Sequence, residues 1–167
     1  MTTGTTPQLD APEAARIALE IFGLRAKVAP LPSERDQNFL LDAGTGRRFV
    51  LKIAKSDEDR AVLELQNAAL RQVAARAPDL AVPRVWPTLQ GDDLVRIEVP
   101  PGRAHYIRLI GWLDGQMLVD TQPHDESLLA SLGTTMADLD QALQGFSHPA
   151  MHRDLHWNLR RADLALG

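Results

Sequence analysis

A lysine in the middle of a predicted strand is the first residue whose position could do chemistry. The stretch from Arg47 to Ile53 favours a strand, because β-branched and aromatic residues follow the turn signal Gly44-Thr45-Gly46. Side chains alternate across a strand, so Lys52 shares one face with Val50 and Ala54. A fixed ammonium in this position can bind the anionic oxygens of a phosphate. The alternative is a lysine at a sheet edge whose ammonium reaches water.

Further candidate donors lie in the polar run 33–38, which separates two predicted strands at 24–29 and 38–41. The donors are Ser33, Arg35, Gln37 and Asn38. Small polar residues also let backbone N–H groups point at an anion, which favours a loop that covers phosphates. A solvated hairpin loop is the simpler alternative. Glu34 and Asp36 would oppose phosphate binding unless they point away or help to hold a metal.

A helix predicted over residues 58–76 could supply a partner for Lys52. Its apolar stripe includes Val62 and Val73, and Gln66 lies within that stripe. A buried amide needs a hydrogen-bond partner, and Lys52 on a neighbouring strand is the obvious one. Glu64 lies on the polar side of the helix and replaces Gln66 as the partner if the register shifts by half a turn.

The other elements predict an α+β fold with a mainly antiparallel sheet of five or six strands and one long packed helix. A first helix is expected over 12–22, ended by Gly23. Pro30 and Pro32 are expected to stop the ladder of the first strand. Three more strands are expected at 85–89, 94–99 and 105–110. A second long helix over 125–143 carries a stripe of large apolar residues, which favours a core position unless part of it is exposed. The stripe consists of Leu128, Leu132, Met136, Leu139 and Leu143.

The composition excludes several classes of function. The 167 residues carry a net charge of −4 without a basic block, which argues against nucleic acid or an anionic membrane as partner. The chain contains no cysteine, so disulfides and thiolate metal sites are excluded. No apolar run approaches the ~20 residues that span a bilayer. A soluble protein in the cytoplasm is expected.

The order of these features resembles the N-terminal lobe of the kinase-like fold, and most closely the aminoglycoside phosphotransferase and choline kinase group. Residues 31–41 and 65–70 resemble the hydroxylysine kinase branch of that group, which also occurs as the first domain of proteins with a class III aminotransferase domain. The resemblance extends from about Ala11 to about Ala162. It implies a disordered lead over 1–10, a nucleotide-binding lobe over 11–111, and a hinge with an incomplete second lobe over 112–167.

The resemblance also implies roles for individual residues. Lys52 would bind the α- and β-phosphates of ATP or GTP, and Val50 would form part of the roof over the base. Leu109 or Leu113 would line the base slot, and backbone groups around Gly111 would bind the purine. A plain strand-to-turn exit with Trp112 in the core is the alternative for this hinge. Mg²⁺ is expected with the nucleotide, and its ligands are expected outside this chain.

A segment near the end of the chain, from His152 to Asn158, invites comparison with a kinase catalytic loop, in which Asp154 would be the base. The spacing is wrong, because only two residues separate Leu155 from Asn158 where the loop needs three. Asp154 is therefore only a weak catalytic candidate. His152 and His156 are four residues apart, but no convincing third metal ligand accompanies them.

These observations favour the nucleotide-binding lobe of a small-molecule kinase that phosphorylates a hydroxyl of an amine- or amino-acid-like metabolite. The chain is expected to be a fragment that is inactive without its catalytic loop. One alternative is a pseudokinase-like module that regulates or docks a larger fused enzyme. Another is an α+β interaction domain that forms a homodimer through its second helix.

Overall fold

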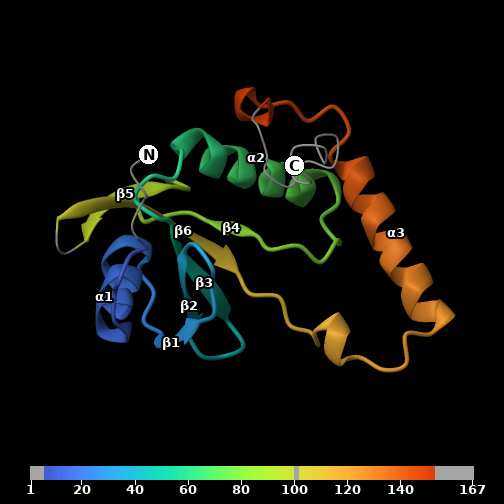
Figure 1. Cartoon of the computed structure of the whole chain (residues 1–167), viewed down its shortest axis with the longest axis horizontal. Helices are drawn as coiled ribbons and strands as arrows, with labels where there is room; N and C mark the ends of the chain where they lie inside the picture. The colour runs from blue at the N-terminus through green and yellow to red at the C-terminus, as the bar shows by residue number, and fades with distance from the viewer. Residues whose placement is uncertain (1–5, 100–101, 153–167) are drawn as a thin grey trace, which may run out of the picture.

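A six-stranded antiparallel sheet forms the centre of the computed structural model, which describes residues 6–99 and 102–152. The strands are β1 (Lys27–Leu31), β2 (Gln37–Asp42), β3 (Arg48–Ile53), β4 (Val85–Trp86), β5 (Val95–Val99) and β6 (Arg103–Gly111). Their order is β1-β2-β3-β6-β4, and β5 pairs with the first part of β6 (Figure 1). The helices are α1 (Ala11–Phe22), α2 (Arg60–Arg76) and α3 (Glu126–Ala142), with short 3₁₀ turns η1 (Leu118–Asp120) and η2 (Pro149–Met151). The prediction of an antiparallel α+β fold is confirmed.

Helices α1 and α2 cover opposite faces of this sheet (Figure 1). The main hydrophobic core lies between α1 and the face of β3 and β6 that carries Leu51 and Leu109, both fully buried. The residue before Leu109 in β6, Arg108, points the other way and donates hydrogen bonds to side chains of α2. One face of the sheet is therefore apolar, and the other carries polar groups.

Helix α1 begins one residue earlier than predicted and ends at Gly23 as predicted. Asp10 and Glu13 form a capping box, which satisfies backbone N–H groups of the first turn. The predicted disordered lead is wrong for residues 6–10, because Leu9 is buried and its backbone is bound by a side chain of β2.

Strand β1 covers Lys27–Leu31 in place of the predicted 24–29. It extends past residue 29 because Pro30 does not end its pairing with β2. Pro30 lies inside the strand, opposite Phe39 of β2. β1 is the edge strand of the sheet and pairs with β2 alone in the described part of the chain. A proline, which has no N–H, is tolerated there because no strand lies on the outer side to accept a hydrogen bond from it. The proline pattern was a correct edge signal that the sequence interpretation used as a stop signal.

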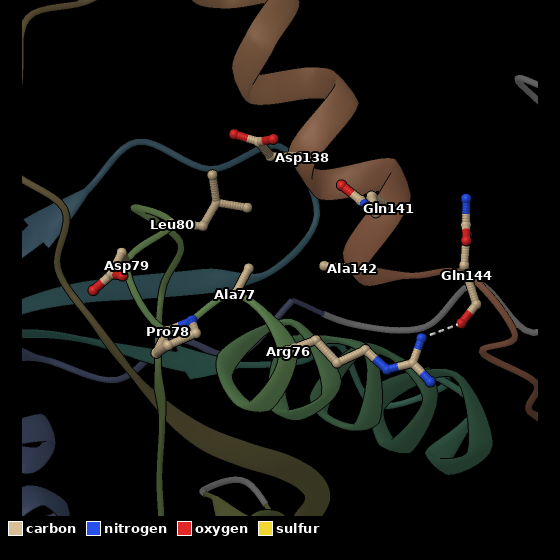
Figure 2. A pocket seen from close by; sticks show the side chains of 9 residues that line it. All are labelled: Arg76, Ala77, Pro78, Asp79, Leu80, Asp138, Gln141, Ala142 and Gln144. Carbon is tan, nitrogen blue, oxygen red and sulfur yellow. Dashed lines mark hydrogen bonds between the residues drawn. The ribbon is translucent and has the colours of Figure 1, made fainter.

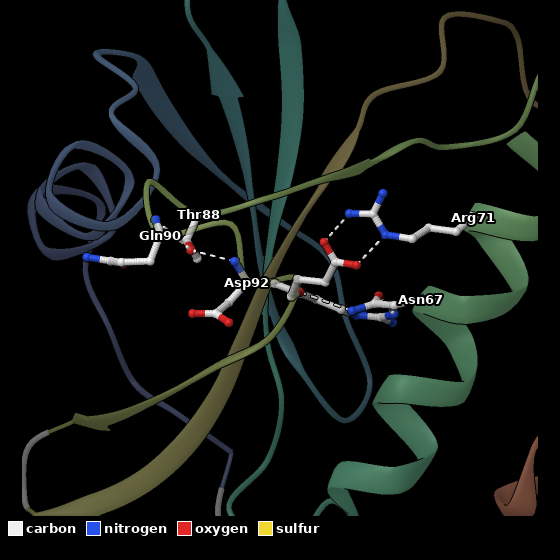
Figure 3. Close-up of polar contacts among 7 residues, drawn as sticks. Asn67, Arg71, Thr88, Gln90 and Asp92 are labelled. Carbon is white, nitrogen blue, oxygen red and sulfur yellow. Dashed lines mark hydrogen bonds and ion pairs between the residues drawn. The ribbon is translucent and has the colours of Figure 1, made fainter. Parts of the chain in front are cut away.

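Strand β4 is shorter than the predicted 85–89, because the chain turns sharply at Thr88. The Thr88 N–H donates to the carbonyl of Asp92 at 2.8 Å, and the Thr88 hydroxyl oxygen accepts from the N–H groups of Gln90 and Asp92 (Figure 3). The residue after this turn, Asp93, forms an ion pair with Arg71 of α2. The turn thereby connects α2 to the sheet.

Helix α3 lies apart from the sheet, and its main contacts with another element of the described residues are with the end of α2 (Figure 1). The Gln72 amide donates to the carbonyl of Ala142 at 3.0 Å, and Arg76 donates to the carbonyl of Gln144 (Figure 2). The predicted apolar stripe is largely uncovered, with Met136 60% exposed, so the exposed alternative describes it better than a core position. None of the helices in the described part of the chain is long and apolar enough to cross a membrane.

Candidate functional site

Lys52 is the second-to-last residue of β3 and lies on the face opposite the apolar core. Its neighbours across the sheet are Asn38 on β2 and Arg108 on β6. The Lys52 Nζ donates to Asn38 Oδ1 at 3.1 Å and lies 3.9 Å from the carboxylate of Asp36. Burial lowers the pKa of Lys52, the charge of Asp36 opposes that shift, and the positive charge of Arg108 adds to it. The ammonium is thus half-buried and only loosely compensated.

The loop between β1 and β2 reaches this lysine through its last residue, Asp36. The other group that contacts Lys52 is Asn38, the second residue of β2. Ser33 and Arg35 are exposed earlier in the loop. The Arg35 guanidinium lies 4.0 Å from the carboxylate of Glu58, just before α2. Ser33 and Arg35 are thus exposed donors in the same loop as Asp36.

Gln37 is wrongly placed by the sequence interpretation. Its side chain points to the α1 face, donates to the carbonyl of Leu9 at 2.7 Å and accepts from the Leu9 N–H at 2.9 Å. Both ends of the amide are thereby used to hold the segment before α1. Because strand neighbours alternate between faces, only Asn38 of this pair can share a face with Lys52.

The residues expected around a purine base divide between the two faces. Val50 lies on the Lys52 face, opposite Leu40 and Ile110 of the neighbouring strands. Leu109 is fully buried in the core on the α1 face, so its expected place in the base slot is wrong. Ile110, one residue later, is the β6 residue that shares the face of Val50.

Two backbone N–H groups at the end of β6 already form hydrogen bonds within the protein. The Gly111 N–H donates to the carbonyl of Arg84 at 2.8 Å, and the Trp112 N–H donates to the carbonyl of Arg48 at 3.0 Å. These two N–H groups are therefore not free to bind a base. The indole N–H of Trp112 donates to Asp114 at 3.1 Å, and the ring is only half-buried, so Trp112 is not a core residue.

The expected bond between Lys52 and α2 is not formed. Gln66 Oε1 accepts from the Arg108 guanidinium, and Glu64 accepts from Arg60 on its own helix at 2.7 Å. Neither proposed partner therefore reaches Lys52. Its closest partners are instead Asn38 of β2 and Asp36, the last residue of the β1–β2 loop.

Arg108 is the residue that the sequence interpretation missed. Arg108 is 6% exposed, and its guanidinium donates to Asn67 Oδ1 at 2.9 Å as well as to Gln66. Asn67 is itself buried and donates to the carbonyl of Asp93 at 3.0 Å, although it lies on the same side of α2 as the polar Glu64 (Figure 3). The sequence does hold a signal for Arg108. Once β3 and β6 are paired, Arg108 stands opposite Lys52, and alternation along β6 puts its side chain on the same face.

No group of three potential metal ligands occurs among residues 6–99 and 102–152. Asp36 is the only carboxylate within 4 Å of the Lys52 ammonium in the described ranges. Asp154, the weak catalytic candidate, lies outside the described residues.

Two cavities lie beside α2. The larger, about 740 Å³, lies between the end of α2, the connector 77–80 and α3, and it is lined by both polar and apolar residues (Figure 2). The smaller, about 350 Å³, has apolar walls from α2, Val82 and α3, and its polar end is formed by Gln66 and Arg108. Both cavities are open to solvent and depend on the position of α3.

The fold is that of small-molecule kinases. A structure of the amicoumacin kinase hAmiN in complex with AMP-PNP, Ca²⁺ and Ami matches with a TM-score of 0.74 at 15% identity, over 95% of this chain and 48% of that one. A structure of the microcompartment-associated aminopropanol kinase matches with a TM-score of 0.65 at 19% identity, over 89% and 45% of the two chains. At these identities the likeness shows a common fold.

The chain belongs to the phosphotransferase enzyme family, whose model matches residues 27–166. Curated relatives include the hydroxylysine kinases of Mus musculus, 29% identical over 91% of this chain, and of Danio rerio, 30% identical over 89%. The predicted resemblance to that branch is therefore confirmed. The chain spans 44% and 42% of the length of these two relatives, less than half of each.

Proposed function

We propose that this chain is the nucleotide-binding part of a small-molecule kinase, and that the Lys52 face of the sheet binds the phosphates of ATP or GTP. The supporting observation is the environment of Lys52, a half-buried ammonium that has one neutral partner and a carboxylate 3.9 Å away. A phosphate oxygen would give the ammonium a charged partner at hydrogen-bond distance, which neither the neutral Asn38 nor the carboxylate of Asp36 at 3.9 Å provides.

The other site residues have different roles in this proposal. Asn38 holds the Lys52 ammonium in place, and Ser33 and Arg35 of the β1–β2 loop cover the phosphates. Val50 contacts the base, with Ile110 in place of Leu109. Gln37, Leu109 and the Gly111 N–H have other partners and are left out.

The proposed reaction transfers the γ-phosphoryl group of the nucleotide to a hydroxyl of an amine- or amino-acid-like acceptor. The bond from phosphorus to the bridging oxygen breaks, a bond to the acceptor oxygen forms, and the hydroxyl proton passes to a base. Hydroxylysine kinase and aminopropanol kinase are named for acceptors of this type, which supports the class. The base and the Mg²⁺ ligands are proposed to come from residues outside the described ranges.

The direct test is calorimetric titration of the chain with MgATP and MgGTP. Lys52→Ala is expected to abolish measurable binding, since it removes the phosphate cation. Lys27→Ala is the matched control, because Lys27 is an exposed lysine on the edge strand β1 and its loss should change nothing. Equal binding by wild type and Lys52→Ala would contradict the proposal, as would the absence of binding in the wild type.

A second candidate function, a pseudokinase-like docking module, is favoured by one observation. In the described part of the chain, no carboxylate of α2 contacts Lys52, so the usual charge pairing between strand and helix is replaced by amides. Strong nucleotide binding that requires Lys52 would count against this candidate.

A further inference from the structure

Two cations oppose each other on the polar face of the sheet. Lys52 of β3 and Arg108 of β6 are paired directly in the antiparallel register. Like charges in such a position repel each other and destabilise a sheet. The arrangement therefore costs folding free energy, and a role in binding an anion would account for it.

The partners of Arg108 leave its charge in place. Arg108 is 6% exposed, and its guanidinium donates to two side-chain amides of α2, Gln66 and Asn67. None of the ion pairs found in the described ranges includes Arg108. Burial lowers the pKa of Arg108, and the more distant carboxylates of Asp36 and Glu58 only partly oppose this. Amides can satisfy its N–H groups, but they cannot neutralise it.

The charges around Lys52 consequently sum to an excess of positive charge. Asp36 is the only carboxylate of the described residues within 4 Å of Lys52, and Glu58 lies 4.0 Å from Arg35. A buried charge is weakly screened, so the field of Arg108 acts on whatever binds at Lys52. A carboxylate in place of Gln66 would have cancelled that field.

We propose that Arg108 is a positioning residue of the phosphate site, which links the sheet to α2 in place of Lys52 and adds a second positive charge behind it. The inference rests on the proposed function and extends it. Arg108 acts through Lys52 and the local field, without contact with the ligand. Its effect therefore grows with the negative charge of the ligand, so that the site favours polyphosphates over uncharged nucleosides.

The test compares ligands of different charge in matched variants. Inorganic tripolyphosphate and adenosine are titrated into wild type, Arg108→Gln, Arg108→Lys and the control Arg96→Gln, which removes an exposed arginine of β5. Arg108→Gln is expected to weaken tripolyphosphate on the order of tenfold and to leave adenosine unchanged, because only the charged ligand feels the lost cation. Arg108→Lys should retain most of the tripolyphosphate affinity, and the control should match wild type. Equal losses for both ligands in Arg108→Gln would overturn the proposal, since a purely structural role predicts that result.

A second readout separates this inference from the proposed function. The pKa of Lys52 is followed by NMR of ¹³C-labelled lysine, with assignment through Lys52→Arg. In folded Arg108→Gln the pKa of Lys52 should rise, because a neighbouring cation has been removed; an unchanged value overturns the coupling. If Arg108→Gln does not fold, Arg108→Lys decides: retention of the wild-type pKa supports the role of charge, and a rise contradicts it. A wild type that binds neither ligand would refute the nucleotide site, while the pKa comparison still decides the coupling.

Discussion

The two faces of the central sheet are built from the same strands but follow different rules. On the α1 face, Leu51 and Leu109 are fully buried and surrounded by apolar side chains. On the α2 face, Lys52 and Arg108 occupy the neighbouring positions and are held by amides and one nearby carboxylate. The first face is stabilised by the burial of apolar surface, which is non-directional and does not require a particular partner for each side chain. The second depends on particular hydrogen-bond partners, and so on the register of each strand and helix.

The difference between the faces predicts that adjacent residues of β3 have opposite effects. Leu51→Ala should lower the free energy of unfolding by about 2–5 kcal/mol, because it leaves a cavity in the main core. The folded fraction of this variant should bind MgATP as wild type does. Lys52→Met should change stability by less than about 1 kcal/mol and abolish binding. Urea denaturation and calorimetry measure the two effects, and loss of binding by folded Leu51→Ala would blur the distinction between the faces.

A smaller effect is expected where α2 is attached to the polar face. Asn67→Ala should cost about 1–3 kcal/mol, because Asn67 is buried and its loss leaves Arg108 and the carbonyl of Asp93 short of partners. Arg71→Ala removes a half-exposed ion pair with Asp93, one turn further along α2, and should cost less than about 1 kcal/mol. Thermal unfolding of both variants compares them, and an equal or greater loss in Arg71→Ala would show that the exposed pair carries the attachment.

The apolar face could be predicted from the sequence because alternation and helical spacing are local. The strand over 47–53, the long helix and the stop at Gly23 all follow from neighbours within a few residues. The same local logic placed Lys52 and Val50 on one face. It erred at Pro30, because edge position depends on which strands pair, and the sequence does not state that.

The polar face was harder because its contacts join distant segments. The partner of Gln66 is Arg108, 42 residues away, and that pairing needs the position of β6 beside β3. The error at Leu109 has the same origin, since a shift of one residue moves a side chain to the other face. The burial of Asn67 is hard to predict for a further reason. A residue on the polar side of a helix can still be buried by a loop from a distant part of the chain, such as the turn before Asp93.

The central claim, that the Lys52 face binds nucleotide phosphates, is tested most directly at the Lys52 ammonium itself. In the free protein the pKa of Lys52 is lowered by burial. A bound polyphosphate stabilises the charged form, so the pKa should rise and protons should be taken up on binding at pH values between the free and bound pKa. An NMR titration of Lys52 against pH, with and without MgATP, is expected to show this rise. An unchanged pKa at saturating MgATP would place the nucleotide elsewhere and contradict the account.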